Sequence, residues 1–117
     1  MENISIYHNP RWSKSRESVK ILEHLGKKFE IIDYIKYPPS STVLKELANK
    51  MGIKGKEFIR KRESVFKELN LNEHLENDDI LFKYMSENPK LIERPIIVRE
   101  NRAILGRPPS KIEELLK

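Results

Sequence analysis

The spacing of apolar residues changes twice within the first third of the chain. Residues 4–7 are typical of a β-strand. From Ser13 or Lys14 onward, apolar residues recur at helical spacing, and Gly26 supplies a stop for that helix. Residues 29–34 then predict a second strand. The chain therefore opens with a β-α-β unit, in which a right-handed crossover makes the two strands parallel.

Helical spacing returns in the middle of the chain, after a break at Pro38-Pro39. The last of the predicted helices has clear boundaries, because Asn77 can cap its first turn and Pro89 cannot continue it. The predicted helical segments are residues 43–51, 57–62, 64–69 and 78–87.

The end of the chain returns to β-structure. Two β-rich runs, residues 94–99 and 102–105, flank the turn-like pair Glu100-Asn101 and predict a hairpin, and residues 110–116 predict a closing helix. The order β-α-β, helices, β-β-α is that of an α/β, thioredoxin-like core with a helical insertion in its middle. We predict one domain over residues 1–117, with the core at about 1–36 and 90–117 and the insertion at about 40–89.

The charge pattern limits the classes of partner. The chain carries a net charge of +5, from 23 basic and 18 acidic residues, but the two signs are interleaved, as on a solvated surface. We therefore expect no nucleic-acid partner, which would favour a stripe of one sign. No apolar run approaches the roughly 20 residues that span a bilayer, and no signal-peptide pattern is present. We expect a cytoplasmic protein with no membrane partner.

The sequence contains no cysteine. This excludes disulfides, thiolate metal sites and a thiol nucleophile in the chain itself. No metal site is predicted.

The turn between the first strand and the first helix has the composition of an anion site. Residues 7–16 read Tyr-His-Asn-Pro-Arg-Trp-Ser-Lys-Ser-Arg. Such a proline-containing turn presents backbone N–H groups and positive charge at a helix N-terminus.

This loop resembles the active-site loop of the glutaredoxin-coupled arsenate reductase family, where a strand is followed by His-Asn-Pro-x-Cys and then by Ser-Arg at the start of the first helix. The resemblance runs from Ile4 to about Ser110, and implies the thioredoxin-like fold. Further motifs appear in the family's order: Tyr37-Pro38-Pro39-Ser40, Met51-Gly52-Ile53, Ile59-Arg60-Lys61, the run from Pro89 to Val98, and Leu105-Gly106-Arg107-Pro108.

The resemblance also implies which residues hold the ligand. Three arginines of the family grip the oxyanion, and they correspond here to Arg60, Arg94 and Arg107. Forked guanidinium donors around a helix N-terminus suit a compact tetrahedral anion. The family's proline before the third strand corresponds to Pro95, expected in a cis peptide bond facing the loop.

Three residues of the loop are open to two interpretations. In the family, the equivalent of His8 helps to hold the thiol as a thiolate, but here it can simply satisfy the backbone at the strand end. Ser15 and Arg16 can hold an anion, or they can cap and solvate the helix.

Trp12 stands where the family has its nucleophilic cysteine. The reaction implied by the resemblance starts when that thiolate attacks arsenic; glutathione then adds and glutaredoxin resolves the mixed species. An indole cannot attack or form a mixed disulfide. Its bulk can fill part of the anion pocket or cover the apolar mouth of the loop. We therefore predict a family member inactive as a reductase, with no bound cofactor; glutathione and glutaredoxin are co-substrates only of an active enzyme.

A second hypothesis is a protein-binding regulatory module. Transcription regulators that dock on RNA polymerase share this superfold and carry a redox Cys-x-x-Cys in the loop, which this chain lacks. An exposed Trp12 beside Arg11 and Lys14 would nevertheless have the composition of a contact hot spot. The three arginines favour the first hypothesis, with a small oxyanion such as arsenate, phosphate or sulfate as the ligand. Glutaredoxin or another protein is a further candidate partner.

Overall fold

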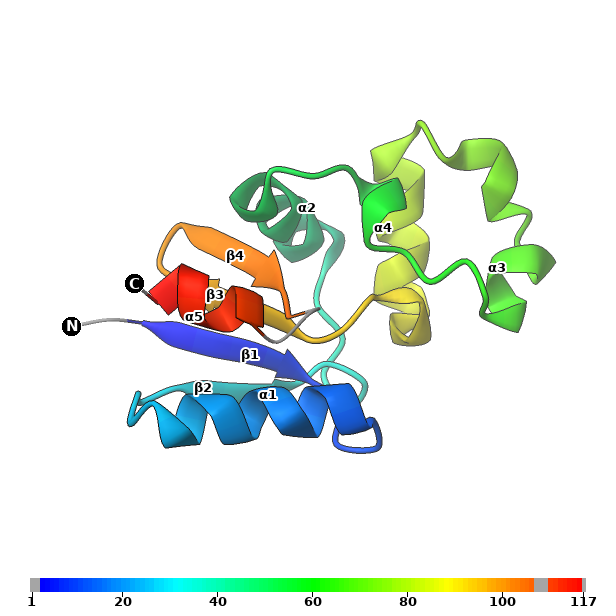
Figure 1. The fold of residues 1–117 in the computed structure, drawn as a ribbon. Helices are drawn as coiled ribbons and strands as arrows, with labels where there is room; N and C mark the ends of the chain where they lie inside the picture. The colour runs from blue at the N-terminus through cyan, green and yellow to red at the C-terminus, as the bar shows by residue number, and fades with distance from the viewer. Residues whose placement is uncertain (1–2, 107–109, 117) are drawn as a thin grey trace. The chain divides into compact units, whose positions relative to one another are not determined.

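The fold was obtained as a computed structural model that describes residues 3–106 and 110–116 (Figure 1). It is an α/β fold with a four-stranded sheet, which confirms the predicted fold class. The chain divides into two compact units, residues 1–37 with 94–117, and residues 38–93. The single domain over residues 1–117 stays a prediction.

The sheet belongs to the first unit. Its strands are β1 (Ile4–His8), β2 (Glu30–Asp33), β3 (Ile96–Arg99) and β4 (Arg102–Leu105), in the spatial order β2-β1-β3-β4. β1 runs parallel to β2 and antiparallel to β3, and β3 and β4 form an antiparallel pair. The parallel opening unit and the closing hairpin are thus both confirmed.

Two helices, α1 (Ser13–His24) and α5 (Ser110–Leu116), lie on the same face of this sheet (Figure 1). Apolar side chains of the central strands meet those of the helices in one core, and Leu22 of α1 is fully buried within it. The other core residues are Ile4, Ile6, Ile97, Ile112, Leu115 and Leu116. This packing holds the N-terminal end of α1 beside the carboxyl end of β1.

The second unit is helical. It contains α2 (Ser41–Met51), α3 (Ser64–Glu68) and α4 (Asp78–Glu87), with the short 3-10 turns η1 (Gly55–Glu57), η2 (Leu71–His74) and η3 (Pro89–Leu91). α2 packs against α4, and the rings of Phe58 and Phe82 lie 6.0 Å apart between centroids. Over the described ranges, no helix combines the length and the apolar character needed to cross a membrane.

The predicted helix over residues 57–62 is wrong. η1 ends at Glu57, and Ile59 then pairs with Ile92 in an antiparallel bridge. Arg60 N donates to Leu91 O at 2.7 Å, and Glu93 N donates to Phe58 O at 2.9 Å. Because the backbone groups find partners far away in the sequence, tertiary pairing overrides local helix propensity here.

The two ends of α2 show how a capping residue and a glycine in the sequence set the bounds of a helix. Ser40 Oγ accepts a hydrogen bond from Val43 N at 3.2 Å, which satisfies one of the free N–H groups of the first turn. At the other end, Gly52 has a φ of +68°, in the left-handed region that glycine adopts without steric cost.

Ser40→Ala is expected to lower the free energy of unfolding by about 1 kcal/mol, because it removes this cap and leaves the N–H group to water. Urea denaturation of the two proteins measures the difference. Thr42→Ala, an exposed position within the same first turn, is the matched control. An equal loss in both variants would contradict a capping role for Ser40.

Candidate functional site

The loop that joins β1 to α1 is closed by its own backbone. Trp12 N donates to Asn9 O at 3.1 Å, and Arg11 N donates to the side-chain Oδ1 of Asn9 at 3.1 Å. Asn9 is itself buried. Asn9 was not among the predicted site residues. An asparagine before a proline is nevertheless a known turn signal, since its side chain can bond to the backbone two residues on.

Two residues predicted at this site tie the loop to the helix. Ser15 is fully buried, and its Oγ accepts a hydrogen bond from Asn9 N at 3.1 Å. Arg16 is exposed, and its Nη1 donates to Pro10 O at 2.9 Å. Both side chains therefore support the shape of the loop.

Trp12 lies against Arg94. The guanidinium carbon of Arg94 is 3.7 Å from the centroid of the indole ring, a cation–π contact. Arg94 is only 2% exposed, whereas Trp12 is 44% exposed. The Arg94-Pro95 peptide bond is cis, as predicted. The residue at the nucleophile position of the loop thus covers one of the three predicted oxyanion arginines.

β4 is followed by Gly106, which lies in close contact with Pro95 and Ile97. Gly106 N donates to Pro95 O at 2.9 Å. A Cβ atom at this position would lie 2.8 Å from Ile97 Cδ1 and 2.9 Å from Pro95 Cγ. The close approach holds the segment that carries Arg94 and Pro95 against the end of β4.

The beginning of α1 is electropositive. Its first turn contains no acidic residue, and Trp12 at the N-cap position makes no side-chain capping bond. Arg11, Lys14 and Arg16 are exposed around it, with Lys14 4.0 Å from Glu17. The helix dipole adds a partial positive charge at the same end. This arrangement favours an anion.

His8 ends β1 directly before the loop. It is 9% exposed, and its Nδ1 has no hydrogen-bond partner among the described residues. Burial lowers the pKa of His8 below its ordinary value of 6.5, the Asp33 carboxylate acts in the opposite direction, and the charge of Arg16 lowers it further. The folded protein therefore favours the neutral imidazole.

This lowered pKa makes stability depend on pH. As the pH falls below about 6.5, His8 takes up a proton in the unfolded chain before it does so in the folded protein. The contribution is therefore fully present above that value and is lost as the pH falls toward the folded-state pKa. Urea midpoints at pH 7.5 and 5.5 are expected to differ less in His8→Gln than in the parent chain. His24→Gln, on an exposed position of α1, is the control. The same decline in His8→Gln and parent would refute the assignment.

Of the other two predicted arginines, the structure describes Arg60 alone. Arg60 is in the second unit, where its Nη1 donates to Glu93 at 2.9 Å and its Nε donates to Glu63 at 3.3 Å. Its side chain is 16% exposed. Arg107 is outside the described residues. A common site for Arg60, Arg94 and Arg107 stays a prediction.

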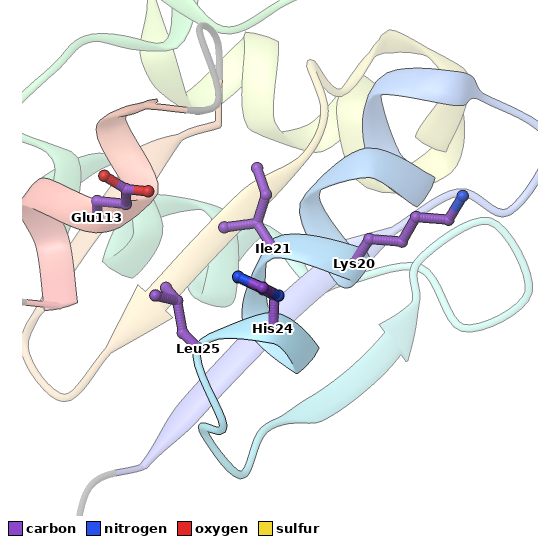
Figure 2. Close-up of a pocket in the computed structure, with 5 residues that line it drawn as sticks. All are labelled: Lys20, Ile21, His24, Leu25 and Glu113. Carbon is purple, nitrogen blue, oxygen red and sulfur yellow. The ribbon is translucent and has the colours of Figure 1, made fainter.

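A surface groove of about 360 Å³ lies away from the loop. It follows the C-terminal half of α1 and reaches Glu113 of α5. Figure 2 shows the side chains that line it, which are Lys20, Ile21, His24, Leu25 and Glu113. None of the predicted site residues is among them. In the part of the chain that the structure describes, no cluster of three or more His, Asp or Glu side chains is arranged to hold a metal ion.

Comparison with known proteins places these observations in a family. The sequence model of the ArsC family matches residues 7–115. YfgD of Escherichia coli K12, a protein without an assigned function, is 38% identical over 116 residues and 98% of each chain. An arsenate reductase of Neisseria meningitidis serogroup A is 39% identical over 118 residues, covering 99% of this chain and 100% of that one. The structure of an arsenate reductase from Vibrio cholerae superposes with a TM-score of 0.91 at 43% identity, over 96% of both chains.

Proposed function

Because this chain belongs to the ArsC family, we propose that it is an oxyanion-binding member that no longer reduces arsenate, a pseudoenzyme of the thioredoxin-like fold. One observation carries the proposal: the residue at the nucleophile position is an indole stacked on the buried guanidinium of Arg94. The positive group that would hold the anion is kept, and the group that would attack it is gone.

The missing step is covalent. In the reaction that the resemblance implies, a cysteine thiolate displaces an oxygen of arsenate, and glutathione and glutaredoxin supply the reducing thiols. No residue of this chain can form that arsenic–sulfur bond, because the sequence has no cysteine. Glutathione and glutaredoxin are therefore not expected to act as co-substrates of this protein, which would work in the cytoplasm as a binder of arsenate, phosphate or sulfate.

Arg94 is the arginine that the local geometry supports best. It lies beneath Trp12 at the electropositive beginning of α1, where backbone N–H groups are free of side-chain caps. Arg60 and Arg107 join it in the proposal on the strength of the family motifs alone. His8, Ser15 and Arg16 then serve to shape and charge the loop, and Pro95 follows Arg94 beside it.

Two measurements on the purified protein test this function. Isothermal titration with arsenate, phosphate and sulfate is expected to show saturable binding of at least one of them, and Arg94→Leu is expected to abolish it. Arsenite formation with glutathione and glutaredoxin is expected to stay at background. Steady turnover would overturn the loss of activity, and absence of binding to all three anions would overturn the oxyanion function.

The exposure of Trp12 supports a second candidate, a protein-docking module. The indole is 44% exposed beside the exposed Arg11 and Lys14, and tryptophan and arginine dominate contact hot spots. Glutaredoxin is a partner to test first. If it binds in a pull-down that Trp12→Ala weakens, while no anion binds, the docking function replaces the first proposal.

A further inference from the structure

The side chain of His8 lies on the face of the sheet that α1 covers. Buried and half-buried residues alternate along β1, and Ile4 and Ile6 belong to the core that the strand shares with α1. Since alternate residues of a strand point to the same face, His8 points to this side as well. Asn9 N, directly after it, donates to Ser15 Oγ in the first turn of α1 at 3.1 Å. His8 is therefore held beside the beginning of that helix.

The imidazole of His8 has a nitrogen without a partner. The residue is 9% exposed, and its buried Nδ1 makes no hydrogen bond with any of the described residues. A neutral imidazole has one donor and one acceptor nitrogen, whereas the protonated ring has two donors and a positive charge. Protonation here would bury a charge without an acceptor, so burial lowers the pKa of His8. The ring stays neutral until a negative group comes close to it.

Three neighbouring elements determine the charge that His8 meets. β2 contributes Asp33, which pairs with His8 in the sheet register and favours the protonated ring. α1 contributes Arg16, whose positive charge favours the neutral ring. β3 contributes no charged side chain at this end, since its Arg99 pairs with the other end of β1, and Arg94, just before β3, stacks on the indole of the loop. An anion at the start of α1 would act on His8 as Asp33 does, and would shift the balance toward the imidazolium.

We propose that the oxyanion site takes up its ligand together with a proton, and that His8 is the residue that carries this proton. The proposal rests on the oxyanion-binding function given above. It gives His8 a part that needs no cysteine: the imidazole is neutral in the ligand-free protein, takes a proton from the solution when the anion binds, and becomes a counter-charge to it. Because the complex then holds one proton more than the free protein, the anion binds more tightly as the pH falls.

Sulfate is the first probe, because it keeps the same charge between pH 7.5 and 5.5. Isothermal titration of the parent protein at constant ionic strength is expected to show binding that is about fivefold tighter, or more, at pH 5.5, as for an ordinary coupling between two sites. The heat of binding is expected to vary with the ionisation enthalpy of the buffer, which measures the proton taken up. In NMR spectra of the parent protein, saturating sulfate is expected to raise the pKa of His8.

Two variants identify the group that takes the proton. His8→Gln is expected to bind sulfate at pH 7.5 and to lose most of the proton uptake and of the pH dependence, because an amide does not titrate. His24→Gln, on an exposed position at the other end of α1, is the matched control and is expected to behave as the parent. Phosphate is titrated into the same three proteins. Its own protonation contributes equally to all of them, so the difference between parent and His8→Gln isolates His8.

The outcomes separate this inference from the function on which it rests. Anion binding with equal affinity at both pH values and without proton uptake would overturn the proton linkage and leave oxyanion binding intact. Proton uptake that persists in His8→Gln, or a pKa of His8 that the anion does not change, would assign the proton to another group and also overturn it. Failure of sulfate, phosphate and arsenate to bind at either pH would overturn the oxyanion function itself.

Discussion

Trp12→Cys is expected to convert a chain with no arsenate reduction into one with measurable arsenite formation in the presence of glutathione and glutaredoxin. The substitution introduces the only thiol of the protein at the N-cap position of α1 and removes the indole from Arg94. The helix dipole and the nearby Arg16 stabilise a thiolate there. Its pKa is expected to lie about one unit or more below the roughly 8.5 of a free cysteine.

The rate of thiol alkylation against pH measures that pKa, and arsenite formation measures the reaction. Trp12→Ser is the control, because it opens the same space without supplying a nucleophile able to do sulfur chemistry, and it is expected to stay inactive. A thiol that titrates near its free value would show that the loop no longer provides the family's environment. A thiolate without reduction would implicate the arginines or a lost glutaredoxin contact, and would favour the docking module.

Leu22→Ala is expected to lower the free energy of unfolding by about 2–5 kcal/mol, a large share of the roughly 5–15 kcal/mol of a typical domain. Leu22 is fully buried in the core that joins α1 and α5 to the sheet, so truncation removes apolar contacts and leaves a cavity. Urea denaturation followed by circular dichroism provides the measurement.

Leu25→Ala is the matched control for Leu22. Leu25 is the C-cap residue of the same helix and is 38% exposed, so its truncation is expected to cost less than about 1 kcal/mol. A similar cost at both positions would show that the core does not anchor α1 through Leu22.

A helix could be predicted correctly where the sequence carries a start signal and a stop signal at its two ends. α4 begins and ends where Asn77 and Asn88-Pro89 indicate, and Asn77 Oδ1 accepts the expected capping bond, from Ile80 N at 3.2 Å. The segment after η1 carries no such signals. Its conformation depends on residues 91–93, which pair with it in the folded chain, and no window of neighbouring residues contains that information.

The loop itself could be predicted, but its contacts could not. The run of residues 7–16 is enough to indicate an anion site at a helix N-terminus. The stacking of Trp12 on Arg94 joins residues from distant parts of the chain and depends on how β3 enters the sheet. The alternatives for Ser15 and Arg16 also needed coordinates, because only the structure shows which backbone atoms they reach.

The carboxylates of Glu63 and Glu93 already accept hydrogen bonds from Arg60, as a bound anion would. An oxyanion that approached Arg60 would therefore meet their negative charge. A ligand that used Arg60 would have to exchange with a carboxylate instead of adding to a vacant guanidinium.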